Sequence, residues 1–467
     1  MTHTRKTTAN PLLTAPIYPQ LIRLMIPLLI GNILHQCYNI VDSLIIGRLL
    51  GIDAFSAIGV AGTIMNLMIF ILNGFCTGLS VIFSTMYGKR DFNEFRKEMF
   101  VSVSYGSALT LGITTLFLII LHPLLHLIRT PQELIVYVTE YLTVIAISLI
   151  ATYAYNLLSS ILRSIGNTAA ALVFLLVSVM ANVGLDILFV ANFQLGIGGA
   201  AWATALSQLL SAAGCWCYLK THNPELIFTK KDIGLHRNLL KTTLRFGAAS
   251  AIQSSNLYIG KMLVQGAVNL LGTAAIAGFT AALRLEGFCN SFGDSGALSV
   301  SVLVSQNQGA GQKNRVQEVL RKGVIFHVIL GITIPSVMLL FTVPGLKLFL
   351  DSSAGGTNAG TIINSDAASS LDSLAARALT QGIGYLRIIA FFYILCFVGS
   401  SLVGYFRGVG MVHVPVIGTT LNISTRVLLS YPLTQRFGLP GLAAATGIGW
   451  MIVVSYQIWN LWRNDSK

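Results

Sequence analysis

The sequence predicts an all-α integral membrane protein in which twelve transmembrane helices form two six-helix lobes. Three observations support this fold class: the composition, an internal repeat and the distribution of charge. Hydrophobic residues make up 54% of the 467 residues and charged residues only 10%, whereas a soluble domain carries roughly 25% charged residues. Most of the chain is therefore expected to lie in lipid, where only helices and closed barrels satisfy the backbone polar groups.

The chain contains two copies of one unit. Residues 51–88 share their pattern of small residues with residues 272–309, and Arg163-Ser-Ile-Gly166 recurs as Arg407-Gly-Val-Gly410. In a hydrophobic chain, such a duplication is typical of transporters built from structural repeats. Because each copy has an even number of spans, both copies enter the membrane from the same side. The two lobes are therefore expected to be related by a pseudo-two-fold axis along the membrane normal.

Apolar stretches define the individual spans, since each is long enough to cross ~30 Å of hydrocarbon. The first copy has residues 22–47, 53–86, 98–121, 134–157, 168–191 and 197–219, and the second has 242–270, 274–306, 320–345, 378–404, 412–434 and 440–462. We therefore expect an amino-terminal lobe at 1–219, a cytoplasmic linker at 220–241 and a carboxy-terminal lobe at 242–467.

The net charge of +13 is explained by topology. Lys and Arg gather in alternate connections, including residues 89–97, 220–245 and 313–322. This positive-inside bias predicts a multi-pass protein of the plasma (inner) membrane with both termini in the cytoplasm. It implies contact with membrane lipids and no nucleic-acid partner, and we expect a monomer.

The second copy is longer than the first, and residues 351–373 account for the difference. This segment is rich in Ser, Gly, Ala and Asn, a composition too polar to span lipid. We interpret it as an insertion in the outward loop between the ninth and tenth spans, dispensable for folding.

Enzyme chemistry has little support in the sequence. The six cysteines fall in apolar spans, where Cys usually acts as a small hydrophobe. The sequence has no zinc-ligand spacing, no phosphate-binding loop and no Ser/His/Asp grouping. We therefore expect no catalytic residue, no cofactor and no metal other than sodium as a coupling ion. A membrane-embedded enzyme is the least favoured alternative.

Polar side chains on three amino-terminal spans fall on single helical faces, because they are spaced by three or four residues. The stripes are His35, Asn39 and Asp42 on the first span, Ser178, Asn182 and Asp186 on the fifth, and Thr204, Gln208 and Ser211 on the sixth. Such groups cost several kcal/mol each in lipid, so these faces are expected to line a hydrated cavity, with Gln36 and Asn156 as further candidates. The alternative is that the two acids are neutral and hold the helices together by hydrogen bonds.

The carboxy-terminal copy carries a different set of polar residues. The stripes are Glu286, Asn290 and Asp294 on the eighth span and Thr419, Asn422 and Arg426 on the eleventh, with Lys261 and Arg284 at membrane depth. Glu286 is the better candidate for attracting a cationic substrate, and an ion pair with Lys261 is the alternative. Asp294 is interpreted as a packing or gating residue.

These features together resemble a known family. The twelve-span duplicated plan, the segments at 162–167 and 306–311 and the acid of the first span are similar to the multidrug and toxic compound extrusion (MATE) transporters, of the multidrug/oligosaccharidyl-lipid/polysaccharide flippase superfamily. The resemblance covers essentially the whole chain. It implies that Pro27 marks a bend in the first helix and that four residues bind the coupling cation: Asp42, Asn182, Asp186 and Thr204.

The sequence departs from part of the family pattern. Some branches carry coupling acids in the seventh and tenth helices, but residues 242–270 and 378–404 contain no Asp or Glu. We therefore expect coupling in the amino-terminal lobe only. Its carboxylate, amide and hydroxyl oxygens suit a proton or a hard cation such as sodium, and two neighbouring carboxylates would resist simultaneous ionisation.

The expected function is secondary active multidrug export by alternating access, in which a proton or sodium ion is exchanged for a cationic, amphiphilic small molecule. One alternative is a lipid-linked precursor flippase of the same superfamily. It is favoured by the basic residues Lys261, Arg284, Arg387 and Arg426, because arginine is suited to binding pyrophosphate.

Overall fold

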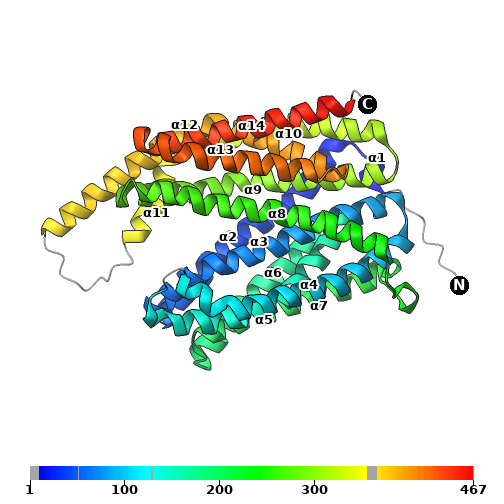
Figure 1. The fold of residues 1–467 in the computed structure, drawn as a ribbon, viewed down its shortest axis with the longest axis horizontal. Helices are drawn as coiled ribbons and strands as arrows, with labels where there is room; N and C mark the ends of the chain where they lie inside the picture. The colour runs from blue at the N-terminus through cyan, green and yellow to red at the C-terminus, as the bar shows by residue number, and fades with distance from the viewer. Residues whose placement is uncertain (1–9, 51, 128–129, 355–364, 466–467) are drawn as a thin grey trace. The chain divides into compact units, whose positions relative to one another are not determined.

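The computed structural model describes residues 10–50, 52–127, 130–354 and 365–465, and the regular structure within these ranges is entirely helical (Figure 1). The first half contains α1 (Pro11–Thr14), α2 (Ile17–Leu50), α3 (Ile52–Lys89), α4 (Phe92–Leu127), α5 (Gln132–Ser164), α6 (Thr168–Asp186), the π-helical η1 (Ile187–Asn192) and α7 (Gly196–His222). The six spans predicted for the first copy correspond in order to the helices from α2 to α7.

The second half follows two short 3₁₀ turns, η2 (Pro224–Leu226) and η3 (Lys230–Asp232). It contains α8 (Arg237–Asn269), α9 (Thr273–Gly309), α10 (Lys313–Leu340), α11 (Thr342–Ala354), α12 (Ser365–Gly408), α13 (His413–Phe437) and α14 (Leu439–Asp465). The predicted span at 320–345 is divided between α10 and α11. Pro344 explains the break, because its ring would clash with the carbonyl of Leu340 in a continuous helix.

The segment at 351–373, predicted as an insertion in the outward loop, is helical at both of its ends. The helix α11 continues to Ala354, and α12 begins at Ser365. Residues 366–376 are rich in Ala and Leu, which favour helix over loop. Residues 355–364 lie outside the described part of the chain.

Length and composition alone mark eight of the described helices as membrane spans. The long helices α7, α8, α9 and α13 are outside this set because they carry more polar residues. Such residues are tolerated in a membrane helix where they face the protein interior.

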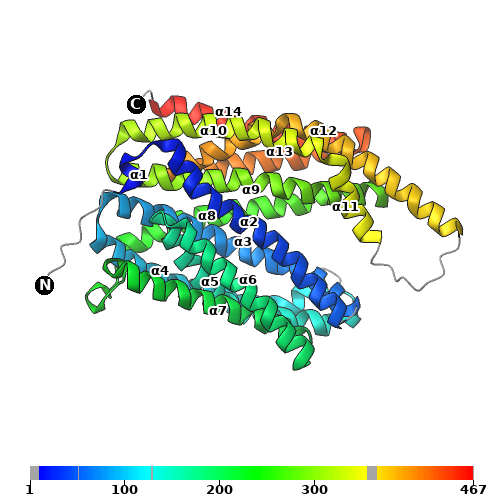
Figure 2. The same cartoon turned by 180° about the vertical axis from the view of Figure 1, so that it is seen from behind.

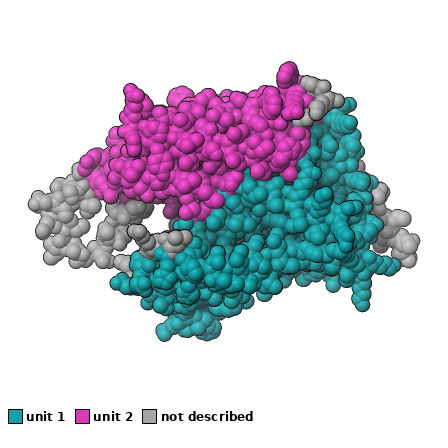
Figure 3. Space-filling view, viewed as in Figure 1, with its two compact units in different colours: residues 1–255, 301–316, 407–410 teal, residues 256–300, 317–406, 411–467 magenta. Residues whose placement is uncertain are grey.

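The chain divides into two compact units (Figure 3). Unit 1 comprises residues 1–255, 301–316 and 407–410, and unit 2 comprises residues 256–300, 317–406 and 411–467. Unit 1 therefore includes one end of each of α8, α9, α10 and α12. The lobe boundaries predicted at 219 and 242 remain a prediction.

Aromatic side chains fill the core of each unit. In unit 1, the rings of Phe83 and Phe95 pack with centroids 4.9 Å apart. In unit 2, Phe279 and Tyr385 meet edge to face at 5.2 Å. Pairs of this kind contribute about 0.5–1.5 kcal/mol beyond the area they bury, so the aromatic residues fix how the helices pack within each unit.

The two copies of the repeat touch at equivalent residues inside unit 1. A Cβ atom on Gly88 would overlap the backbone carbonyl of Gln306, and a Cβ atom on Gly309 would overlap that of Thr85. Gly88 and Gly309 occupy the same position in the two copies, as do Thr85 and Gln306. The ends of α3 and α9 therefore cross with backbone against backbone, an approach that only glycine permits.

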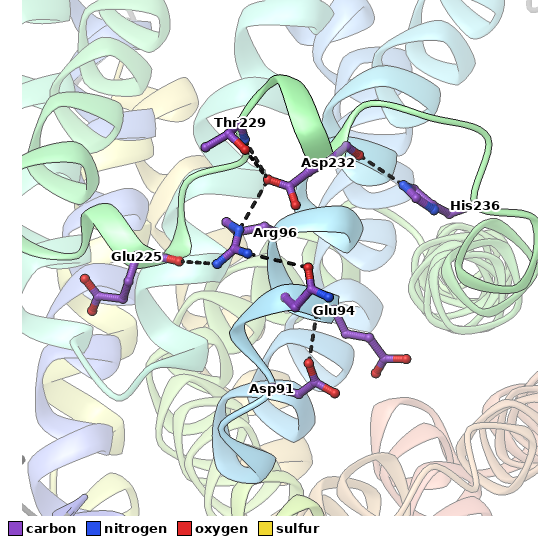
Figure 4. Close-up of polar contacts among 8 residues, drawn as sticks. Asp91, Glu94, Arg96, Glu225, Thr229, Asp232 and His236 are labelled. Atoms are coloured by element: carbon purple, nitrogen blue, oxygen red, sulfur yellow. Dashed lines mark hydrogen bonds and ion pairs between the residues drawn. The ribbon is translucent and has the colours of Figure 1, made fainter.

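Hydrogen bonds fix the linker to the start of α4 (Figure 4). Arg96 donates to Asp232 Oδ2 at 3.2 Å and to the backbone oxygen of Glu225 at 3.3 Å. The backbone N–H and the hydroxyl of Thr229 each donate to the same Asp232 oxygen at 2.8 Å. Burial alone would raise the pKa of Asp232, but the Thr229 hydrogen bonds and the charge of Arg96 together lower the pKa below its usual value. Asp232 is therefore ionised at neutral pH.

Candidate coupling site

The polar stripe predicted on the fifth span lies on the buried face of α6. Ser178, Asn182 and Asp186 are 3%, 2% and 0% exposed. Their spacing places them one turn apart on the same face. Since α6 packs against both α2 and α7, this face is turned toward neighbouring helices within unit 1.

Asn182 connects Asp186 to α7. With its amide oriented to satisfy both neighbours, Asn182 donates to Asp186 Oδ2 at 2.9 Å and accepts from the backbone N–H of Thr204 at 3.1 Å. The Thr204 hydroxyl lies 3.3 Å from the same amide oxygen. The structure thus brings together three of the four predicted coupling residues. Their side-chain oxygens form a donor set suited to a proton or a hard cation.

Asp186 is also the last α-helical residue before the π-helix η1. A π-helical turn has one more residue per hydrogen-bonded ring than an α-helical turn, and such turns occur frequently at functional sites. Sequence reasoning missed this change, because the apolar residues of Ile187–Asn192 are compatible with a continuing α-helix.

The first span contributes the helix α2, which is dark blue in Figure 2 and packs against α6. Asp42 and Asn39 belong to α2, but their side chains lie outside those that the structure describes, so their predicted roles remain predictions. Of the neighbouring candidates, His35 is exposed and Gln36 is half-buried. The helix continues without interruption through Pro27 from Ile17 to Leu50.

The remaining amino-terminal candidates have mixed environments. Ser211 on α7 is 0% exposed, whereas Gln208 on α7 and Asn156 on α5 are half-buried. A cavity of about 440 Å³ in unit 1 has a different location: its lining includes Thr85, Phe246 and Gly410 and none of the predicted site residues. The cavity is therefore separate from the Asn182–Asp186–Thr204 cluster.

In unit 2, Glu286 is 6% exposed and accepts hydrogen bonds from two tyrosines of α12. Tyr385 donates to Oε2 and Tyr393 to Oε1, each at 3.2 Å. The charge of Arg426 acts on this carboxyl more strongly than that of Lys261. The two tyrosines were not among the predicted site residues, because no polar spacing within α12 distinguishes them from core aromatics.

The other carboxy-terminal candidates are more accessible. Lys261, Arg284 and Asp294 are exposed, and Arg426 is half-buried. Within the described ranges, no ion pair shorter than 4.0 Å joins Glu286 to Lys261. The groups that contact the Glu286 carboxylate oxygens are the hydroxyls of Tyr385 and Tyr393, and the ion pair with Lys261 remains an alternative.

Comparisons with known proteins agree with the resemblance seen in the sequence. The MatE family model matches residues 27–188 and 249–432. The chain is 27% identical over 440 residues to a probable multidrug resistance protein of Bacillus subtilis, YpnP, covering 93% of this chain and 92% of the relative. It is 24% identical over 451 residues to a probable multidrug resistance protein of Thermotoga maritima, NorM, covering 92% and 89%.

Solved structures match over nearly the whole length. A multidrug resistance MATE family transporter in an outward-facing conformation has a TM-score of 0.86 at 21% identity, covering 98% of each chain. A MATE structure in a bent conformation also gives a TM-score of 0.86 at 21% identity, covering 99% of this chain and 98% of the other. The predicted fold class, twelve transmembrane helices in two lobes, is thereby confirmed.

Proposed function

This chain belongs to the MATE family of membrane transporters, and on that premise we propose that it exports drug-like organic cations in exchange for protons or sodium ions. Family membership excludes the membrane-embedded enzyme alternative. The observation that carries the proposal is the buried cluster of Asn182, Asp186 and Thr204. A charged carboxyl group buried away from water is costly, and a bound proton or cation would remove that cost. We also propose a plasma-membrane location with both termini in the cytoplasm.

Binding of a cation at this cluster would change its charge. A proton or sodium ion neutralises Asp186 and removes the cost of burying a charge, so the loaded and empty sites favour different packing of α2, α6 and α7. If the drug favours the arrangement that the cation disfavours, each ligand lowers the affinity for the other. That reciprocal effect is the thermodynamic basis of exchange.

Glu286 is our candidate for contact with the substrate. The carboxyl group that accepts from Tyr385 and Tyr393 offers an opposite charge, which favours organic cations. The relatives described as multidrug resistance proteins support a drug-like substrate class.

Transport by purified protein in sealed vesicles tests the proposal, with a proton gradient and a sodium gradient imposed separately. We expect efflux of a cationic dye to depend on one gradient. Asp42→Asn and Asp186→Asn should each abolish that dependence and leave protein abundance unchanged, since an amide keeps the shape but cannot be charged. Asn182→Ala and Thr204→Ala should weaken cation affinity without eliminating transport. Gradient-driven transport retained by the double Asp42→Asn, Asp186→Asn variant would refute the amino-terminal site.

The flippase alternative rests on exposed positive charge in unit 2. Lys261 and Arg284 are exposed, and such groups suit a pyrophosphate-linked lipid. The same vesicles distinguish the two functions: movement of a fluorescent lipid pyrophosphate across the bilayer, without dye efflux, would favour the flippase.

A further inference from the structure

Glu98 is a buried carboxyl group near the start of α4 that has no part in the proposed cation or drug sites. The residue is 0% exposed. Oε1 is 2.7 Å from the hydroxyl of Thr243 on α8 and 3.2 Å from the hydroxyl of Ser102 one turn along α4. Oε2 has no hydrogen-bond partner among the residues that the structure describes.

The two contacts of the Thr243 hydroxyl indicate that the Glu98 carboxyl group carries a proton. Thr243 Oγ1 lies within hydrogen-bonding distance of two oxygens, Glu98 Oε1 at 2.7 Å and the backbone oxygen of Leu239 at 2.8 Å. A threonine hydroxyl has only one hydrogen to donate, but it can also accept. Both short contacts are satisfied if Glu98 carries a proton on Oε1 and donates it to Thr243, while Thr243 donates to Leu239. With an ionised Glu98, one of the two contacts lacks a hydrogen.

The charges around Glu98 also favour the neutral acid. Nearby titratable groups are Tyr153 on α5 and Glu94 on α4 itself, neither of which is a cation. No Lys, Arg or His nitrogen within the described ranges lies within 4.0 Å of the carboxyl. Arg96, two residues before Glu98 on α4, already pairs with the carboxylate of Asp232 in the linker at 3.2 Å.

Asp232 and Glu98 are two buried acids near the start of α4 that differ in their hydrogen-bond partners. Both are almost fully buried, but the partners of Asp232 include an arginine and a backbone N–H, whereas both partners of Glu98 are hydroxyl groups. Removing a lone carboxylate from water costs several kcal/mol, and binding a proton avoids that cost.

We propose that Glu98 is a proton-binding site that links α4 to α8, the first helix of the second repeat. When the two helices pack together, the carboxylate takes a proton from a hydronium ion of the solvent, which leaves a water molecule, and an O–H bond forms on Oε1. When they separate, water reaches the carboxyl and accepts the proton again. The contact between α4 and α8 is therefore stabilised by acid and weakened by base, independently of the coupling site on α6.

Thermal unfolding of the full-length purified protein at several pH values tests this site without any transport assay. The unfolded chain releases the Glu98 proton near the ordinary pKa of about 4.3, and the folded chain keeps it. The folded state then binds more protons, so stability falls as pH rises above about 4.3, by up to about tenfold in the unfolding equilibrium constant per pH unit. In Glu98→Gln, which cannot titrate, this part of the pH dependence should disappear.

Glu133→Gln is the control, because it makes the same change of acid to amide at an exposed residue in the first turn of α5. It should leave the pH dependence unchanged. An unchanged slope in Glu98→Gln, or an equal change in both variants, would overturn the proposal.

Infrared difference spectroscopy gives a second readout. At neutral pH, wild type minus Glu98→Gln should show the carbonyl band of a protonated carboxylic acid. Ser102→Ala keeps the acid but removes a donor that stabilises the ionised form, so its band should persist to higher pH than in the wild type. A difference spectrum with only a carboxylate band at neutral pH would show that Glu98 is not a proton site.

Discussion

The crossing of α3 and α9 makes Gly88→Ala a sharp test of how unit 1 is packed. The added methyl group would overlap the carbonyl of Gln306, which belongs to a helix backbone and accepts from Ala310 N at 2.9 Å. The Gln306 side chain is also fixed, because Nε2 donates to Ser164 O at 2.6 Å and Oε1 accepts from Asn10 at 2.8 Å. Neither partner of the contact can therefore move without breaking other interactions.

The expected magnitude follows from two opposing effects. Replacing glycine by alanine in a helix gains at most about 1 kcal/mol of helix propensity. Overpacking typically costs about 1–3 kcal/mol, and a blocked backbone places Gly88→Ala at the upper end. We expect a net loss of about 2 kcal/mol, equivalent to an increase of roughly thirtyfold in the unfolding equilibrium constant.

Equilibrium unfolding of the purified protein in mixed detergent measures this loss. Gly62→Ala is the control on the same helix, because no neighbouring atom lies within 4 Å of the place that its added methyl group would take, and it should leave stability equal to or above that of the wild type. Gly309→Ala, at the equivalent position of the second copy, should lose as much as Gly88→Ala. If Gly88→Ala and Gly62→Ala were equally stable, the close crossing of α3 and α9 would be refuted.

Three further predictions concern other parts of the molecule. Because the pKa of Asp232 is lowered in the folded protein, its stabilising effect is present above the unfolded pKa of about 3.9 and is lost as pH falls; Asp232→Asn should therefore lower the melting temperature at pH 7 and have little effect near pH 3. Glu286→Gln should reduce export of cationic dyes more than that of neutral compounds in the vesicle assay, and an equal loss of both would indicate a structural role. Ser365→Cys should react with an impermeant thiol reagent in intact cells, and labelling only after lysis would contradict the outward orientation of the insertion.

The amino-acid sequence alone was enough to predict that the chain lies in lipid, how many spans it has and that it is duplicated. These follow from local properties: an apolar run must become a helix in lipid, whatever its neighbours are. The spacing of Ser178, Asn182 and Asp186 likewise predicted a single buried face, because helical periodicity is a local property. The resemblance to the MATE family added the pairing of this face with Thr204.

Which distant groups come into contact became visible only in the folded structure. The segments at 162–167 and 306–311 were recognisable in the sequence, but their direct contact through Ser164 and Gln306 depends on how α5 and α9 pack. Sequence reasoning did not single out Glu98, an acid at the start of a span, as a special site, because nothing in its local sequence shows that Thr243 lies opposite. The hydrogen bond of Glu98 joins it to Thr243, 145 positions along the chain. In our proposal, the approach of these two residues in space determines whether the Glu98 carboxyl group keeps its proton.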